Sequence, residues 1–152
     1  MIGGEVQTIY LVKGAGEGNT PLNAFDNALL TAGIGDVNLV KVSSIVPPNA
    51  RVVEDVPSIP RGALVPCVYV AKTSLQSGQH LVVGIGVGIA RDGFGVIMEA
   101  EGESAEQLQV QIKNMVEEAF RMRGLKAERF MLVICEHRVK KIGCAFAGAV
   151  FW

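Results

Sequence analysis

The stretch LVVGIGVGIA, residues 81–90, is the longest apolar run of the chain and the strongest indication of its fold class. It is about half as long as the roughly 20 residues that a membrane-spanning helix needs, and it contains three glycines. A short continuous apolar run of this kind is typical of a fully buried β-strand. The sequence therefore predicts a buried strand here and no membrane segment.

Further strands are expected where similar apolar runs recur along the chain. Each run is rich in Val, Ile, Phe or Gly. Its apolar residues either alternate with polar ones or follow one another without interruption, as they do in strands. The first run, lengthened by one residue to 80–90, is one of about seven expected strands. The strands are 6–12, 37–43, 63–71, 80–90, 94–100, 129–137 and 142–151.

A first helix is predicted to begin after Thr20, because Thr20 can cap it and Pro21 is favoured at the first helical position. Gly33 stands where such a helix would end. Asp26 falls at the margin of the apolar stripe. That stripe consists of Leu22, Phe25 and Leu29.

A second helix is predicted from Ser104, which forms a capping box with Gln107, to Gly124. Its buried face is expected to hold Leu108, Ile112, Met115, Val116, Ala119 and Phe120.

Two helices against about seven strands, without regular alternation, predict a single α+β domain: a layered sandwich with mostly antiparallel sheets. Strands with so few charges must be covered on both faces, so subunit contacts are expected as well.

The composition restricts the classes of function. A chain of 152 residues fits one domain. Hydrophobic residues make up 49% of it, and the formal net charge is −1. Neither disorder nor a nucleic-acid partner is expected, because phosphate binding normally requires a basic surface. Three widely spaced cysteines fit neither disulfides nor a metal site, and MIGGEVQTIY has no signal-peptide pattern, which favours a cytoplasmic protein.

Several motifs favour ordinary structural roles over chemistry. KGAGEGNTP, residues 13–21, matches neither a phosphate-binding loop nor a dinucleotide fingerprint, and it is expected to be an entry loop. Cys135 and His137 would lie side by side on one strand face without an orienting carboxylate, so a nucleophilic pair is disfavoured. Glu99 follows an apolar run, where a solvated turn is the usual setting, although burial there would raise the pKa of its carboxyl.

The stretch SSIVPP, residues 43–48, carries the clearest chemical signal. A serine hydroxyl can attack the preceding carbonyl and convert the peptide bond to an ester. Elimination then leaves dehydroalanine, which hydrolyses to a pyruvoyl group. Pro47 and Pro48 help to hold the backbone beyond the serines. Such a ketone forms an imine with the amine of an amino acid and accepts electrons when carbon dioxide leaves.

At this point the sequence resembles the pyruvoyl-dependent arginine decarboxylases, from about residue 9 to the end. The likeness rests on these segments: TPLNAFDNALLTAGIGDVNLVKVSSIVPP, GALVP, GVIMEAEG, RMRG and EHRVKKIGCAFAGAVFW.

The resemblance implies self-cleavage between Ser43 and Ser44 into a β chain, 1–43, and an α chain, 44–152. Ser44 would become the covalent pyruvoyl cofactor, and neither pyridoxal phosphate nor a metal would be needed. The resemblance also implies an αββα sandwich that assembles as trimers or hexamers.

The same resemblance implies roles for further residues. Asn38, expected on the same strand face as Ser44, would position the site, and Glu99 would donate a proton. Asp26 would receive the guanidinium of arginine, with which a carboxylate forms two parallel hydrogen bonds. The apolar part of the pocket would consist of Leu22, Leu29 and Ile45.

The expected activity is thus decarboxylation of L-arginine to agmatine, within polyamine biosynthesis. Two alternatives stay open: the same chemistry on another amino acid, and an unprocessed, non-catalytic homologue.

Overall fold

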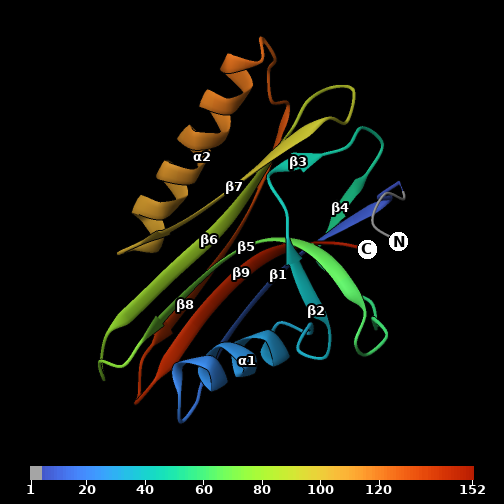
Figure 1. Cartoon of the computed structure of the whole chain (residues 1–152). Coiled ribbons are helices and arrows are strands. Elements are labelled where there is room, and N and C mark those ends of the chain that lie inside the picture. The colour runs from blue at the N-terminus through green and yellow to red at the C-terminus, as the bar shows by residue number, and fades with distance from the viewer. Residues whose placement is uncertain (1–4) are drawn as a thin grey trace.

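In the computed structural model, which describes residues 5–152, two helices and two β-sheets form an α+β fold (Figure 1). The predicted fold class is therefore confirmed. Residues 1–4, which begin the stretch examined for a signal peptide, lie outside the described residues. Among the described residues, no helix is both long enough and apolar enough to cross a membrane.

The first sheet has five strands in the order β2-β5-β9-β1-β4. The pairs β1–β9 and β5–β9 are antiparallel, whereas β1–β4 and β2–β5 are parallel. Its strands are β1 (Thr8–Glu17), β2 (Asn38–Lys41), β4 (Arg51–Val53), β5 (Leu64–Ser74) and β9 (Gly143–Phe151).

The second sheet is antiparallel and has four strands in the order β3-β7-β6-β8. Its strands are β3 (Ile45–Val46), β6 (His80–Ile89), β7 (Gly95–Gly102) and β8 (Arg129–Arg138). Because the short strand β3 is at one edge, β7 is covered there only over Gly95 and Val96.

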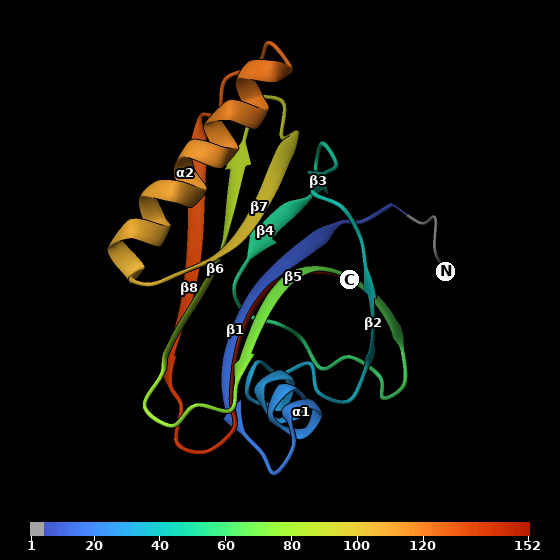
Figure 2. The ribbon, with the colours of Figure 1, turned by 60° about the vertical axis from the view of Figure 1, so that its left-hand side comes forward.

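The layers follow the order helix, sheet, sheet, helix (Figure 2). Helix α1 (Pro21–Thr31) packs on the outer face of the five-stranded sheet, and α2 (Ala105–Met122) packs on the outer face of the four-stranded sheet. A third apolar core, which contains Ile9 and Ile85, lies between the sheets. The helix caps are as predicted, since Thr20 accepts the amide of Asn23 and Ser104 accepts the amide of Gln107.

Glycines on alternate strand positions explain how closely the helices approach the sheets. In β6, Val83 and Ile85 face the core between the sheets, and Gly86 faces α2, where a methyl group would overlap Ile112. In β1, a methyl group on Gly16 would overlap the backbone of α1 at Ala28. Both strands therefore use glycine to admit a helix, which is the usual reason for glycine inside a strand.

Two local predictions are wrong because of this packing, and two short strands were not predicted. Residues 13–17 continue β1 and do not form an entry loop. The buried face of α1 consists mainly of the small residues Ala24 and Ala28, which fit against the glycines, so Leu22 is 76% exposed. Strands β3 and β4 were not expected, because two or three residues carry no periodic signal.

Candidate active site

The Ser43–Ser44 peptide lies where the chain crosses from one sheet to the other. Strand β2, which precedes it, is an edge strand of the five-stranded sheet, and β3, which follows it, is an edge strand of the four-stranded sheet. Ser43 is exposed and Ser44 is partly buried. The Ser43–Ser44 peptide bond therefore lies between an edge strand of one sheet and an edge strand of the other, and it belongs to neither sheet.

Backbone hydrogen bonds hold this crossing on both sides. Upstream, the amide of Val42 donates to the carbonyl of Cys67 on β5 at 3.2 Å. Downstream, the amide of Ile97 on β7 donates to the carbonyl of Ser44 at 2.7 Å. The two serines are thus presented on a short segment with fixed ends.

The prolines shape the segment beyond Ser44. The amide of Ala50 donates to the carbonyl of Pro47 at 3.2 Å, and Asn49 has a φ of 77°. Proline at the second turn position and a positive φ at the third define a type II turn, which returns the chain toward β4. Val46, before the turn, is 0% exposed, so the downstream side of the crossing is also held by packing.

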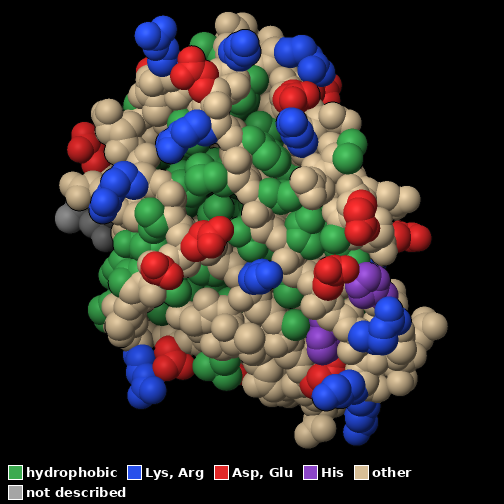
Figure 3. All heavy atoms as spheres, turned by 180° about the vertical axis from the view of Figure 1, so that it is seen from behind, with side chains coloured by type: hydrophobic (Ala, Val, Ile, Leu, Met, Phe, Trp, Pro, Cys, Tyr) green, Lys and Arg blue, Asp and Glu red, His purple; other side chains and the backbone are tan. Residues whose placement is uncertain are grey.

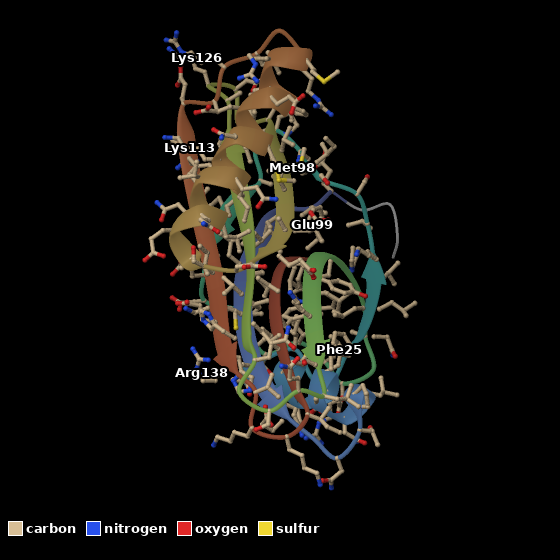
Figure 4. All side chains as sticks on the ribbon, turned by 90° about the vertical axis from the view of Figure 1, so that its left-hand side faces the viewer. Phe25, Met98, Glu99, Lys113, Lys126 and Arg138 are labelled. Carbon is tan, nitrogen blue, oxygen red and sulfur yellow. The ribbon has the colours of Figure 1, made fainter. Side chains whose placement is uncertain are left out.

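Glu99 lies on β7 close to this crossing. It is two residues beyond Ile97, and alternation along the strand directs it to the same side as Ile97, toward the core between the sheets. Figure 4 shows Glu99 beside the edge of β7. Burial raises the pKa of its carboxyl, and the positive charge of Lys41 opposes this effect. Glu99 is therefore a partly buried acid and not a solvated turn carboxylate, the setting that this stretch of sequence favours by itself.

Asn38 begins β2 and is tied to a different segment. Its side-chain amide donates to the carbonyl of Gly62 at 3.1 Å. Strand β2 ends at Lys41, so alternation within one strand does not extend to Ser44, and the expectation of a shared strand face is wrong. The reason is that the chain leaves the sheet after Lys41 in order to reach the other one.

The residues expected to bind substrate do not all lie near Ser44 within one chain. Asp26 and Leu22 are exposed on α1, and Leu29 is only 7% exposed in the core beneath that helix. In Figure 4, Phe25, the neighbour of Asp26, lies well separated from Glu99 along the molecule. Ile45 follows Ser44 directly and is 39% exposed.

Two functional candidates were missed by the sequence reasoning. The ammonium of Lys41 lies over the ring of Tyr69, 4.7 Å from its centroid, and Lys41 is also the cation that acts on Glu99. Its position two residues before Ser43 was an available signal. Nothing in the sequence near Tyr69 indicates a role for it, because Tyr69 meets Lys41 only through the pairing of β2 with β5.

Cys135 and His137 do not form a nucleophilic pair. The Cys135 thiol is directed to the carbonyl of Gly14, and Nε2 of His137 lies 2.6 Å from Oε2 of Glu17. Oε1 of Glu17 accepts the amide of Lys141 at 2.7 Å. This cluster joins β1 to the turn between β8 and β9, and its role is structural.

The residues present fit a pyruvoyl group derived from Ser44. The carbonyl of Ser44 would remain as the amide carbonyl next to the new ketone, and Ile97 already holds it. In the described part of the chain, no group of three or more His, Cys, Asp and Glu side chains is placed to hold a metal ion. A cavity of about 470 Å³ between the end of α2 and β8 is lined by other residues and does not include Ser44 or Glu99.

A Ser–Ser peptide held between two sheet edges, with a partly buried acid on the adjoining strand, fits the class of enzymes that make their own carbonyl cofactor. Comparison with known proteins specifies the family. Residues 8–152 match the family described as "Pyruvoyl-dependent arginine decarboxylase (PvlArgDC)". The chain belongs to this family.

Curated relatives with that name cover nearly the whole chain. The protein of Methanocaldococcus jannaschii is 46% identical over 148 residues, which are 95% of this chain and 89% of the relative. That of Pyrococcus horikoshii is 41% identical over 143 residues, or 92% and 90% of the two chains. That of Methanothermobacter thermautotrophicus is 38% identical over 148 residues, or 96% and 97%.

Proposed function

We propose that this protein decarboxylates L-arginine to agmatine and carbon dioxide, and that its cofactor is a pyruvoyl group made from Ser44. The observation that carries the proposal is the Ser43–Ser44 peptide, held at the crossing between the two sheets beside Glu99, in a chain of this family.

Cofactor formation begins with attack of the Ser44 hydroxyl on the carbonyl carbon of Ser43. The peptide C–N bond breaks, and an ester forms between the two residues. Elimination then releases a carboxylate on Ser43, and water replaces the nitrogen of the resulting dehydroalanine, which leaves as ammonia. The products are residues 1–43 and residues 44–152, the latter with a ketone at its first position. The bonds from Val42 to β5 and from Ser44 to β7 keep both new ends in place.

In the reaction itself, the pyruvoyl group supplies an electron sink when the substrate carboxylate leaves. The α-carbon then needs a proton, and Glu99 donates it. Burial favours this role, because it raises the pKa of Glu99 and so keeps its proton available at higher pH. Asn38 assists in positioning the site.

The guanidinium of arginine is received by Asp26, and its methylenes contact Leu22, Leu29 and Ile45. Asp26 is exposed on α1 and Glu99 lies on β7, and the two residues meet when α1 of one subunit adjoins the crossing of the next. A trimer, or a hexamer of paired trimers, provides this arrangement. Hydrophobic side chains gathered on the rear face in Figure 3 favour such association.

The proposal includes neither pyridoxal phosphate nor a metal as cofactor. A cytoplasmic location agrees with three cysteines that are all free and buried.

Denaturing mass spectrometry and product analysis test the proposal together. The wild-type protein should give two fragments and convert arginine to agmatine, whereas Ser44→Ala should remain one chain and form no product. Asp26→Asn should still be cut but should bind arginine about 10- to 100-fold more weakly, since a charge-assisted hydrogen bond contributes roughly 1.5–3 kcal/mol. An intact wild-type chain would indicate a non-catalytic homologue, and unchanged arginine turnover by Asp26→Asn would indicate another substrate.

A further inference from the structure

The short strand β3, which follows Ser44, lies unusually close to β7 (Figure 1). Val46 of β3 is paired with Gly95 of β7, and a Cβ atom placed on Gly95 would lie only 2.9 Å from the Cβ of Val46. Facing Cβ atoms on neighbouring antiparallel strands are normally about 4.5–5.5 Å apart. Val46 is fully buried, so it fills space that a side chain at position 95 would otherwise occupy. The lack of a side chain at Gly95 therefore sets how closely β3 approaches the sheet.

The turn that follows β3 also rests against a glycine. Gly93, in the connection between β6 and β7, has a φ of 89°, and a Cβ atom on it would lie 3.0 Å from the amide nitrogen of Asn49. Asn49 is the third residue of the type II turn that begins at Pro47. Both β3 and its turn thus approach the end of β7 too closely for an ordinary side-chain contact.

This close approach fixes the position of Ser44. Two residues along from the Val46–Gly95 pair, the amide of Ile97 donates to the carbonyl of Ser44 at 2.7 Å, and upstream the amide of Val42 is bonded to β5 of the other sheet. Only residues 42–44 lie between these two anchors, so their backbone dihedral angles must absorb any displacement of β3. One of these angles, the φ of Ser44, sets the direction of its hydroxyl relative to the carbonyl carbon of the preceding residue.

We propose that Gly95 is a positioning residue for the self-cleavage: because it has no side chain, β3 lies deep enough against β7 for the Ser44 hydroxyl to reach the carbonyl carbon of Ser43. This inference rests on the proposed formation of the cofactor from Ser44.

A methyl group at position 95 would displace β3 and not the centre of the sheet. It would also meet the carbonyl oxygen of Gly88 on β6, at 2.6 Å. However, β6 is paired with the long strands β7 and β8 on its two sides, whereas β3 is an edge strand of two residues. The edge strand is therefore the part that moves, and Ser44 moves with it.

The test is the rate at which newly made full-length chain is cut, followed by cell-free synthesis, a chase and denaturing mass spectrometry. Gly95→Ala should be cut about 100-fold more slowly than the wild type, since a misplacement of about 1 Å can have that effect on two groups that must meet in a defined geometry. Gly86→Ala is the matched control, because it adds the same methyl group to the same sheet on the opposite face, where it would overlap Ile112 of α2. Gly86→Ala should lower Tm but be cut at close to the wild-type rate.

A double-mutant cycle with Val46→Gly tests the route of the effect. Val46→Gly removes the Cβ atom that a methyl group at position 95 would meet. In this background, Gly95→Ala should slow cleavage by less than about 10-fold. The double variant should nevertheless have a lower Tm than Gly95→Ala alone, because it has lost a buried side chain. A merely structural role of Gly95 predicts the opposite order, since the cleavage rate would then follow stability.

A second variant covers the case in which circular dichroism shows that Gly95→Ala does not fold. Gly93→Asn would press on the turn after β3 at Asn49, and asparagine tolerates a positive φ. It should also be cut more slowly than the wild type.

Three results would overturn the inference. They are cleavage of Gly95→Ala, or of Gly93→Asn in its place, at the wild-type rate; equal slowing by Gly86→Ala; and an undiminished effect of Gly95→Ala in the Val46→Gly background. Failure of the proposed function gives a different result, because the wild-type chain itself would then stay in one piece.

Discussion

Adding one methyl group at Gly16 tests how the fold positions the substrate residues of α1. In Gly16→Ala, the new carbon would lie 2.6 Å from the amide nitrogen of Ala28 and 2.7 Å from the carbonyl carbon of Asn27. Both atoms belong to the helix backbone, which cannot rotate aside as a side chain can. Since ordinary contacts begin near 3.4 Å, α1 must move outward by roughly 1 Å.

The magnitude of the effect follows from this displacement. Overpacking of this kind costs about 1–3 kcal/mol of unfolding free energy. For a chain of this size, each 1 kcal/mol lowers Tm by about 2–4 °C, so a decrease of about 2–12 °C is expected. Because α1 carries Asp26, kcat/KM for arginine should fall by up to about 100-fold, the loss that a 1 Å misplacement can cause.

Calorimetry, steady-state kinetics and denaturing mass spectrometry measure these effects separately. Cleavage at Ser43–Ser44 should persist, because the crossing is anchored on β5 and β7 and not on α1. Gly102→Ala is the matched control, since its nearest neighbours are side-chain atoms of Leu108 at 3.3–3.7 Å, which can adjust. A wild-type Tm and kcat/KM in Gly16→Ala would refute the account of α1 packing, and loss of cleavage would show that the damage is not local.

Three further predictions concern catalysis, stability and processing. Glu99→Gln should still be cut, but kcat should fall about 10²- to 10⁴-fold, the usual contribution of a general acid; cleaved protein with unaltered kcat would exclude Glu99 as donor. Burial alone would raise the pKa of Glu17, but hydrogen bonds from His137 and the amides of Lys141 and Lys140 lower it overall. Glu17→Gln should therefore lower Tm at neutral pH, and the difference from wild type should shrink as the pH falls below about 4.3, the unfolded pKa; a difference independent of pH would contradict this account. After cleavage, residues 1–43 should stay bound to residues 44–152 under native conditions, because β1 pairs with β9 from Ile9 to Glu17 and Ile9 is fully buried; native mass spectrometry that finds free fragments would show otherwise.

Much of the fold could be predicted because its signals are local. Thr20 and Ser104 start their helices by accepting amides three residues ahead, and Gly33 and Gly124 follow the helices with positive φ values. The apolar runs are strands because continuous burial on both faces requires continuous apolar sequence. The serine pair was likewise recognisable, since its chemistry lies between adjacent residues.

The sequence by itself determined the fold class, the helix ends and the family, because periodicity, capping and motif spacing act over a few residues. Only the tertiary structure decided that Gly16 and Gly86 let a helix approach the sheet closely, that Ser43–Ser44 connects two sheet edges, and that Lys41 lies over the ring of Tyr69. These arrangements depend on which strands pair and at what register. Pairing is governed by packing between distant segments, which no short stretch of sequence records.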